Sequence, residues 1–462
     1  MFRGRGVREA AFVTGGTMAT ETVNLDALAS AAEGIVGAEY LHRGERAEAF
    51  ALGTHTPALV AAPGTAEEVG ALLKRADELG AAVVPWGGGT HQSLGYPPRQ
   101  YDLALSLRRL NAMLKYTPED LTCAAQAGMT LADLQTALAV NGQMLPLDPA
   151  YADRVTLGGI LATHASGPRR HGYGTIRDFC IGLDAAYVDG TVAKAGGMVV
   201  KNVTGFDLMK MHLGALGTLG VLTRLNFKLL PKPAAERTLV IQCTRAEVAF
   251  AFAARIVASP LMPMALEYVS PQTARQVRAP LDGDLLCVRC EGSAATVTRQ
   301  ERDIRDWCAG ADGDFIEVAT VAGDAHYRLW TSLADWSGTR DLTPSVAVLK
   351  LAAMPTELPA ALMDVERVGA ENGLEIAVRA SVGIGVAFLR VTGDADAVGL
   401  RRALTTLQSR WPALTVWGAD PAHAARLPMW GIEPPTTGVM RELKDSYDPN
   451  STLNPGRFLG GI

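Results

Sequence analysis

The hydrophobic and polar positions of the first 230 residues alternate between helical and extended periods. Residues 65–80 (TAEEVGALLKRADELG) repeat apolar positions at helical spacing, with Thr65 and Glu68 placed as an N-terminal capping box and Gly80 as a stop. Residues 81–86 (AAVVPW) form the short apolar run that is typical of a buried strand. Strand-like and helical stretches keep alternating to residue 231, which predicts an α+β domain over residues 23–231.

A second pattern begins after Pro231 and Pro233. Between residues 234 and 435 glycine clusters are few, and amphipathic stretches at 245–259 and 358–373 alternate with strand-like runs. This predicts a second α+β domain over residues 232–435. Residues 436–462 are punctuated by glycine and proline again, and we expect them to pack back on the first domain.

The bulk composition is that of a globular protein of more than one domain. The 462 residues are too many for one ordinary core, while 48% hydrophobic and 20% charged residues exclude a disordered chain. The net charge of −5 and the scattered basic residues argue against a nucleic-acid or polybasic membrane surface. No apolar run reaches the length of a transmembrane helix.

The first 22 residues predict a flexible extension before the fold. Their early arginines are followed by no apolar signal-peptide core and no small-residue cleavage site, so we expect no secretion signal. A transit peptide is the alternative, and Met18 is a possible start. We therefore expect a cytoplasmic protein.

Six thinly spread cysteines suit a reducing compartment. Cys287 and Cys290 have C-x-x-C spacing, but they lie in an apolar run, whereas a redox pair opens a helix and a metal site needs a second pair. The run predicts a core strand, and no set of four clustered thiolates is available for an iron–sulfur centre.

Three glycine-rich segments carry the candidate chemistry, at residues 85–95 (PWGGGTHQSLG), 156–178 and 201–223. Glycine lets backbone N–H groups approach a bulky anion closely. One such loop could equally be a tight turn, but three within about 140 residues point to a phosphate-bearing cofactor. The segments match neither the dinucleotide fingerprint nor a Walker loop, and the chain has no G-x-S-x-G or H-E-x-x-H motif.

Four motifs together resemble the FAD-linked oxidases of the vanillyl-alcohol oxidase/p-cresol methylhydroxylase (PCMH) type. They are VVPWGGGTHQSLG, TLGGILATHASGPRRHGYGTIRDFCIGL, DGTVAKAGGMVVKNVTGFDLMKMHLGALGTLGVLT and the terminal YDPNSTLNPGRF. Within that family the chain is similar to the FAD-binding subunits of bacterial glycolate oxidase. The resemblance implies an α+β fold: a PCMH-type FAD-binding domain of two α+β subdomains, an α+β cap domain, and a tail that returns to the first domain.

The resemblance also implies which residues hold FAD. The pyrophosphate loop would be made by Trp86, Gly87, Gly88, Gly89, Thr90, His91, Gln92 and Gly95. The flavin ring and ribityl chain would be lined by Thr156, Gly158, Gly159, Ala165, Ser166 and Gly167, with Gly172 and Gly174 in the same turn. Further contacts would come from Gly217, Thr218, Gly220, Val221, Asn454 and Arg457.

Other polar residues near these motifs have a functional and a plain interpretation. Lys201, Asn202 and Thr204 lie beside the cofactor region, and Asp207 is expected to cap a helix. The pair Arg169–Arg170 could steer a carboxylate or a partner subunit, but a solvated dibasic turn is favoured. His91 stands where some relatives attach flavin covalently. Because the match is partial, we expect non-covalent FAD.

The substrate machinery of the family's catalytic members is missing from the sequence. Those members carry an H-x-G-x-G-N-x-H segment, and its counterpart here, RASVGIGVAFLRV, places Ser381 and Phe388 at the histidines and Val386 at the asparagine. Only His326 and His423 lie in the second domain, without metal-ligand spacing, so we assign no metal and no catalytic residue.

The resemblance therefore implies an FAD-binding subunit that works with a catalytic FAD subunit and an iron–sulfur subunit of a glycolate oxidase complex. Any association with the inner face of the membrane would come through these partners. One alternative is a stand-alone dehydrogenase of a 2-hydroxy acid, of D-lactate type, with Arg379, Arg390 or Lys350 as the carboxylate anchor and His326 or His423 as the base. Another is a structural subunit with an empty FAD site.

Overall fold

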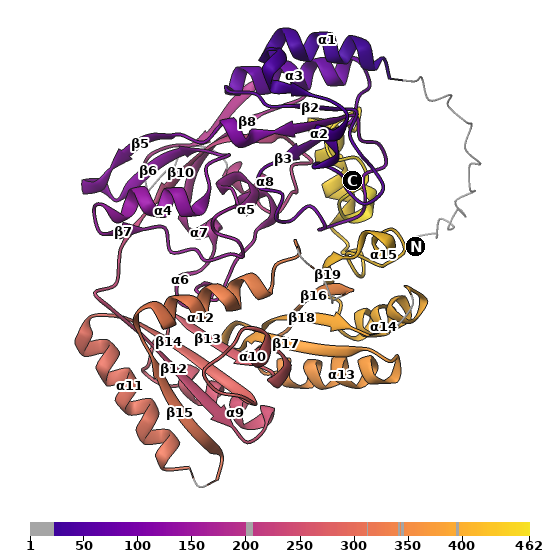
Figure 1. Ribbon diagram of the computed structural model, residues 1–462. Helices are drawn as coiled ribbons and strands as arrows, with labels where there is room; N and C mark the ends of the chain where they lie inside the picture. The colour runs from indigo at the N-terminus through magenta and orange to yellow at the C-terminus, as the bar shows by residue number, and fades with distance from the viewer. Residues whose placement is uncertain (1–22, 200–206, 312, 341, 343–345, 394–396) are drawn as a thin grey trace, which may run out of the picture.

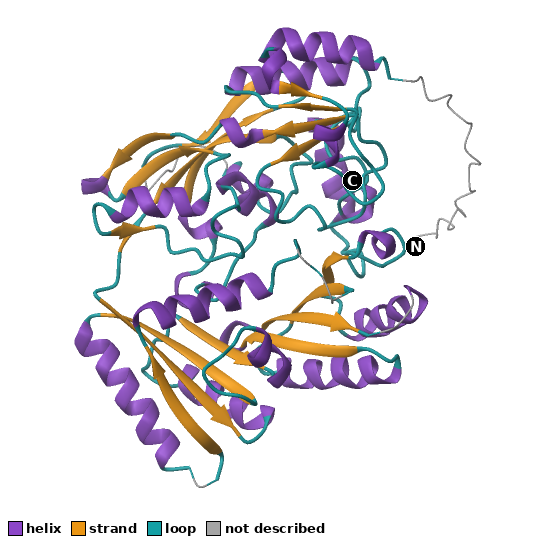
Figure 2. Cartoon of the chain, in the orientation of Figure 1, coloured by secondary structure: helices purple, strands orange, loops and turns teal. Residues whose placement is uncertain are grey.

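The computed structural model describes residues 23–199, 207–311, 313–340, 342, 346–393 and 397–462 (Figure 1). The extension expected at residues 1–22 and the cluster Lys201, Asn202 and Thr204 lie outside these described residues. The α+β class is confirmed. Helices and strands build an upper part from the first half of the chain and a lower part around one broad sheet (Figure 2).

A four-stranded sheet begins the first part, in the order β1-β2-β4-β3. Its strands are β1 (Leu41–His42), β2 (Leu59–Ala61), β3 (Val83–Trp86) and β4 (Leu103–Ser106), and β4 runs parallel to both neighbours. The helices here are α1 (Leu25–Val36), α2 (Glu45–Glu48) and α3 (Ala66–Glu78). The Thr65 hydroxyl accepts a hydrogen bond from the Glu68 N–H at 3.1 Å, which confirms the predicted cap of α3.

A five-stranded antiparallel sheet follows, in the order β5-β6-β10-β8-β9. Its strands are β5 (Met113–Thr117), β6 (Thr122–Gln126), β8 (Cys180–Ala186), β9 (Val192–Gly196) and β10 (Val221–Lys228), and β7 (Gln143–Met144) pairs separately with β11 (Leu230–Pro231). The helices are α4 (Leu131–Ala139), α5 (Leu157–Thr163), α6 (Arg170–Tyr173), α7 (Ile176–Phe179) and α8 (Met209–His212). The helix cap expected of Asp207 is wrong, because Leu208 is the N-cap of α8 and the Asp207 carboxylate pairs with Lys210.

The second part is built on an eight-stranded sheet in the order β15-β12-β14-β13-β17-β18-β16-β19. The strands are β12 (Ala235–Cys243), β13 (Ala265–Val269), β14 (Asp284–Gly292), β15 (Phe315–Val321), β16 (Ala347–Ala352), β17 (Glu375–Ser381), β18 (Val386–Thr392) and β19 (Leu414–Ala419). The helices are α9 (Ala246–Val257), α10 (Pro271–Gln276), α11 (Ala294–Ala309), α12 (Gly323–Trp336), α13 (Leu358–Glu371), α14 (Ala397–Arg410) and α15 (Pro421–Ala424).

Hydrophobic cores cover both faces of this sheet. Successive side chains on a strand point to opposite faces, so each strand contributes to both cores. On β12, Leu239 and Ile241 pack with α9, α11, α13 and α14, while Val240 packs on the side of α12. Figure 1 shows α12 between the sheet and the upper part of the molecule. Cys287 and Cys290 are buried on β14 in the two different cores, which confirms the predicted strand and separates the two thiols.

The C-terminal residues lie against the first part of the chain. Helix α16 (Thr437–Tyr447) is followed by Leu453, which forms a parallel bridge with Val83 of β3. The buried Lys444 ammonium pairs with Asp448 and donates to the carbonyl oxygens of Thr218 and Leu453, at 3.0 and 2.9 Å. These bonds seat the tail beside the loops that follow β3 and α8.

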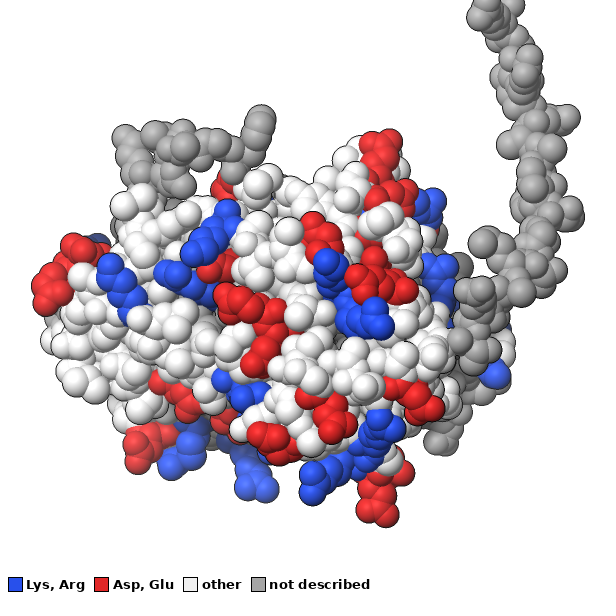
Figure 3. Space-filling model, turned by 90° about the horizontal axis from the view of Figure 1, so that it is seen from above, with Lys and Arg blue, Asp and Glu red and all other residues white. Residues whose placement is uncertain are grey.

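The surface shows no extended charge of one sign on the face of Figure 3, where acidic and basic side chains are interspersed. Among the helices that the structure describes, none combines the length and apolarity that crossing a bilayer requires.

Candidate cofactor-binding site

The glycine loop at residues 87–95 is held between two other segments of the protein. A Cβ on Gly88 would lie 1.8 Å from the Arg154 carbonyl oxygen. Gly95 has a φ of +84°, and a Cβ there would lie 2.4 Å from the Arg457 carbonyl oxygen. The absence of side chains at these two positions is therefore required by packing within the protein, before any cofactor is considered.

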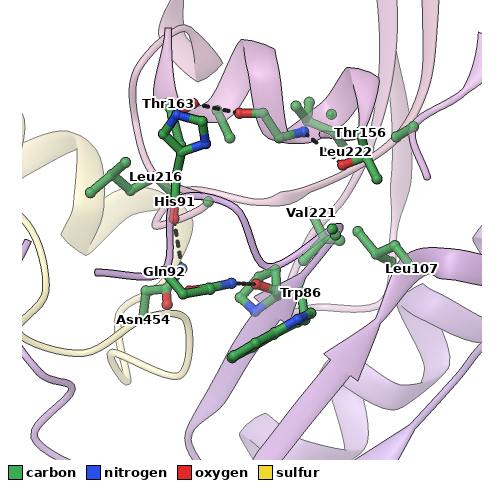
Figure 4. Close-up of a pocket in the computed structure, with 18 of the residues that line it drawn as sticks. Trp86, His91, Gln92, Leu107, Thr156, Thr163, Leu216, Val221, Leu222 and Asn454 are labelled. Carbon is green, nitrogen blue, oxygen red and sulfur yellow. Dashed lines mark hydrogen bonds between the residues drawn. The ribbon is translucent and has the colours of Figure 1, made fainter. Parts of the chain in front are cut away.

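A cavity opens beside this loop. Its lining comes from the glycine loop, from α5, from the loop after α8 and from the C-terminal tail. Figure 4 shows Trp86 and Gln92 on one side and Thr156 and Thr163 on the other. Of these four residues, Trp86, Gln92 and Thr156 were predicted. The other predicted residues in the lining are Gly87, Gly88, Gly89, Thr90, His91, Gly158, Gly159, Gly217, Gly220, Val221, Asn454 and Arg457.

The loop presents free hydrogen-bond donors. Within the described part of the chain, the backbone N–H groups of residues 88–92 donate no hydrogen bond. Unsatisfied backbone donors that line a cavity are rare in native proteins unless water or a ligand accepts from them. Consecutive N–H groups of this kind form an anion-binding concavity, so the loop fits a pyrophosphate.

Helix α5 makes the opposite wall nearly free of side chains. The Thr156 hydroxyl caps it by accepting from the Gly159 N–H at 3.2 Å, and the Thr163 hydroxyl donates to the Gly159 carbonyl at 2.7 Å. Gly158 and Gly159 thus expose helix backbone to the cavity. Such a wall accommodates a flat ring system or an extended polyol chain.

Arg457 ties the C-terminal tail to the glycine loop. Its buried guanidinium donates to the Gln92 side-chain oxygen at 2.8 Å, to the Gln92 carbonyl at 2.6 Å, and to the oxygens of Leu94 and Asn454. Burial lowers the pKa of Arg457 to about 10, so the group is still a cation at neutral pH. Asn454 donates to the Leu216 carbonyl at 2.6 Å and so braces the loop after α8.

His91 is an uncharged residue in the wall of the cavity. Its Nδ1 lies 2.9 Å from the Thr90 hydroxyl, and its ring meets Trp417 edge to face at 5.8 Å. Burial first, and then the Lys350 charge, lower the pKa of His91 to about 4. The imidazole is therefore uncharged across the physiological range.

Comparison with known proteins identifies the two parts. A family model described as "FAD binding domain" matches residues 57–196, and one described as "FAD linked oxidases, C-terminal domain" matches residues 232–416. The chain belongs to the FAD-linked oxidases. FAD is therefore its cofactor, in agreement with the free N–H groups and the bare wall of the cavity.

Relatives of known name share most or part of the chain. The glycolate oxidase subunit GlcD of Bacillus subtilis is 26% identical over 87% of this chain and 89% of its own length. A D-lactate dehydrogenase of Archaeoglobus fulgidus is 27% identical over 87% and 91%. The glycolate oxidase subunit GlcE of Escherichia coli is 37% identical over 33% of this chain and 43% of its own length.

Solved structures establish the PCMH-type fold. p-Cresol methylhydroxylase superposes with a TM-score of 0.73 over 94% of this chain and 96% of its own, at 15% identity. The 4-ethylphenol oxidase of Gulosibacter chungangensis gives a TM-score of 0.72 over 93% and 96%, at 17% identity. At these identities the likeness concerns the fold alone.

Some residues that the motifs assigned to FAD lie outside the cavity lining, namely Gly95, Ala165, Ser166, Gly167, Gly172, Gly174 and Thr218. Several of them have packing reasons of their own. A Cβ on Gly167 would meet the Asp148 carbonyl oxygen at 1.7 Å, and one on Gly172 would meet the Met264 backbone of β13 at 2.8 Å. These glycines fit the FAD-binding domain against its neighbours.

Other lining residues were missed by the sequence reasoning: Pro85, Leu94, Leu107, Ala127, Ala162, Thr163, His212, Leu216 and Leu222. Ala162 and Thr163 follow Gly159 on α5 at the spacing of one helical face, so the helix pattern could have found them. Leu107 and Ala127 carry no such signal, because only the tertiary fold brings them to the wall.

Ser381 and Phe388, which stand where histidines were expected, are buried in this FAD-linked oxidase. The Ser381 hydroxyl donates to the buried Glu267 carboxylate, which also faces Arg379 at 3.3 Å. Phe388 is 4% exposed and stacks under the Arg379 guanidinium at 5.0 Å. The residues that the structure describes contain no group of three His, Cys, Asp or Glu placed to hold a metal.

The arginine pair is not a solvated turn. Arg169 is largely buried and pairs with Glu236 and Glu291 at 2.9 and 3.0 Å, so that expectation is wrong for this residue. The two glutamates belong to β12 and β14, which makes Arg169 a link between the FAD-binding domain and the eight-stranded sheet. Burying a charge requires such partners, and the sequence could not show them.

Proposed function

We propose that this FAD-linked oxidase is the FAD-binding subunit of a glycolate oxidase complex, in which a separate catalytic flavoprotein subunit oxidises glycolate to glyoxylate. An iron–sulfur subunit would complete the complex. The observation that carries the proposal is a contrast. The glycine-rich segments of the FAD-binding motifs line one cavity, whereas the expected histidine pair is replaced by the buried residues Ser381 and Phe388. The similarity to two named glycolate oxidase subunits supports it.

The chain's own residues bind and orient the cofactor. FAD, when bound, supplies a two-electron acceptor that can return electrons one at a time. The N–H groups of residues 88–92 would donate hydrogen bonds to its pyrophosphate, the α5 backbone would line its site, and Arg457 and Asn454 would hold the loop in place.

At the two histidine positions of the family, Ser381 and Phe388, this chain offers no base to abstract a proton from a hydroxy acid. Such a base needs a pKa near the working pH and a free lone pair, as a histidine provides. The Ser381 hydroxyl is buried and donates a hydrogen bond to the Glu267 carboxylate, while Phe388 has no acid–base function. His326 of α12 is buried, and its Nδ1 lies 2.8 Å from the hydroxyl oxygen of Thr238 on β12.

The second candidate is a stand-alone 2-hydroxy-acid dehydrogenase, favoured by the similarity to a D-lactate dehydrogenase. Two of the three expected carboxylate anchors already have partners. Arg379 forms an ion pair with Glu267 at 3.3 Å, and Arg390 donates to the Trp336 and Gly338 carbonyls. The Lys350 ammonium forms no hydrogen bond or ion pair with any residue that the structure describes, and it lies 4.4 Å from the centre of the Trp417 ring. A purely structural subunit is the third candidate, and it predicts no thermal stabilisation by FAD.

Purification from the native host tests the proposal. We expect FAD to co-purify with this chain together with a second flavoprotein and an iron–sulfur protein, in the cytoplasmic or peripheral membrane fraction. Recovery of the flavin-loaded chain free of both partners under mild conditions would count against the complex.

The attachment of FAD gives a separate prediction at His91. The neutral imidazole shares a hydrogen bond with Thr90 and packs on Trp417, so we expect no bond to the flavin. After acid precipitation of the loaded protein, the yellow colour should be in the supernatant, and His91→Asn should release flavin in the same way. Flavin in the wild-type pellet but not in that of the variant would refute this.

A further inference from the structure

His212 lies in the wall of the cofactor cavity, and the resemblance to FAD-linked oxidases implies no role for it. It ends α8, and the loop that follows is bonded to α5: the Gly214 N–H donates to the Leu161 carbonyl at 3.0 Å, and the Leu216 N–H donates to the Ala162 carbonyl at 2.8 Å. Only 5% of His212 is exposed. Buried polar groups are normally hydrogen-bonded, so both nitrogens of this ring need a partner.

Tyr187 supplies the partner of one ring nitrogen. Its hydroxyl lies 3.0 Å from the His212 Nε2, with the two ring centres 5.9 Å apart. Tyr187 follows β8 directly and is held in a tight turn, because its N–H donates to the Thr191 carbonyl at 2.9 Å. The bond between the two side chains therefore fixes the orientation of the imidazole.

The Tyr187 ring is itself held by two other segments. A Cβ on Gly220, which also lines the cavity, would lie 3.0 Å from the Tyr187 Cε1, so the ring packs directly on this glycine. Tyr447 of α16 packs on the same ring, with the ring centres 5.4 Å apart. The place of His212 in the cavity wall thus depends on the start of β10 and on the C-terminal helix.

The second nitrogen of His212 has no partner in the protein. Its Nδ1 forms no hydrogen bond with any residue that the structure describes. The Nδ1 atoms of His55 and His171 also lack a partner, but protein encloses them completely, whereas the Nδ1 of His212 is not fully enclosed. Burial lowers the pKa of His212 to about 4, so the ring is neutral at pH 7 and has one donor and one acceptor nitrogen.

We propose that His212 forms a hydrogen bond with bound FAD through its Nδ1, and that Tyr187 is the residue that positions it. The inference rests on FAD as the cofactor and is independent of the proposed role in a complex. Burial raises the pKa of Tyr187, so its hydroxyl keeps its proton at neutral pH. When this hydroxyl donates to Nε2, the Nδ1 carries the hydrogen and donates to an oxygen of FAD.

Titration of the stripped protein with FAD measures the contribution of the imidazole. His212→Leu removes both nitrogens and leaves a polar group of FAD without a partner. We expect the affinity for FAD to fall about tenfold, which corresponds to about 1.4 kcal/mol. His212→Asn places an amide close to the position of Nδ1, and because an amide can donate or accept, it should keep most of the affinity.

Tyr187→Phe tests the positioning. It removes the hydroxyl but keeps the ring against Gly220 and Tyr447, so we expect FAD binding to weaken about threefold. Tyr116→Phe is the matched control. The Tyr116 hydroxyl donates to the Gln143 side-chain oxygen at 3.0 Å in the same domain, and Tyr116 does not line the cavity. This variant should bind FAD as the wild type does.

A spectroscopic signature separates contact with FAD from a purely structural role. In protein labelled with ¹⁵N at histidine, the His212 Nδ1 resonance is identified by its absence from His212→Asn. It should move when FAD is added to the stripped wild type, and it should move less in Tyr187→Phe. The resonances of His42 on β1, outside the cavity lining, should stay in place.

Three results would overturn the role of His212: unchanged FAD affinity in His212→Leu, equal loss of affinity in His212→Asn and His212→Leu, or an Nδ1 resonance that FAD does not move. If His212→Leu were too unstable to titrate, the asparagine variant and the wild-type resonance would still decide. A wild-type chain that bound no FAD would contradict the role as well. Absence of partner subunits would leave all these measurements unchanged, so the two proposals are tested separately.

Discussion

Replacing Gly88 by alanine is expected to remove most of the FAD from the protein. The added Cβ would lie 1.8 Å from the Arg154 carbonyl oxygen, a backbone atom that no rotamer change can move aside. Overpacking of this kind costs about 1–3 kcal/mol and displaces the loop. Because the loop carries the free N–H groups of residues 88–92, we expect FAD affinity to fall about 100-fold, which corresponds to about 2.7 kcal/mol.

The measurement is the ratio of flavin to protein absorbance, followed by titration of the stripped protein with FAD. Gly34→Ala is the matched control, since Gly34 lies within α1 and a Cβ there meets nothing within 4 Å. It should bind FAD normally and be slightly more stable. Equal flavin content in both variants would show that the loop does not hold the cofactor.

Replacing Arg457 by methionine is expected to loosen both the C-terminal tail and the FAD site. The guanidinium donates to four oxygens of the loop and tail, and methionine leaves these buried acceptors without a donor. Each hydrogen bond to a charged group contributes about 1.5–3 kcal/mol, although such contributions are not additive. We expect the free energy of unfolding to fall by about 3 kcal/mol, together with at least tenfold weaker FAD binding.

Chemical denaturation and FAD titration measure the two effects. Arg441→Met is the control, because Arg441 is an exposed donor to Gly460 in the same tail and its loss should change stability by no more than about 0.5 kcal/mol. A variant at Arg457 that matched this control in both measurements would remove the tail from the cofactor site.

Several segments that the sequence assigns to the cofactor share one cavity in the structure. The loop at residues 87–92, the start of α5 and the tail around Asn454 all line one cavity, as their glycines and their resemblance to FAD-linked oxidases implied. The physical reason for the glycines is partly different from the one expected. At Gly88 the space is filled by Arg154 of the protein itself, a contact between segments more than 60 residues apart that no local pattern encodes.

Side-chain partnerships across the interface could not be predicted. The sequence predicts Arg169 to be half of an exposed dibasic turn. In the structure it is largely buried and forms ion pairs with Glu236 and Glu291 of the eight-stranded sheet. The sequence shows Lys350 only as one polar position in a strand. The fold brings its ammonium 4.4 Å from the centre of the Trp417 ring, which also contacts His91. Local periodicity reports which face of an element is polar, but not what stands opposite.

Loss of the histidines was visible in the sequence, and the structure gives its physical consequence. Ser381 and Phe388 are not empty places in an open substrate site: they are packed into the sheet around Glu267 and Arg379. Returning a histidine to one position would therefore not restore a base with access to solvent.

The central claim is that this chain carries FAD but does not itself oxidise the hydroxy acid. The most direct test mixes the isolated, FAD-loaded protein with glycolate under anaerobic conditions and follows the flavin absorbance. We predict that the oxidised spectrum persists with glycolate alone and that it bleaches rapidly only when the partner subunits are added. Rapid bleaching by glycolate alone, at the rate of the complete complex, would contradict the account.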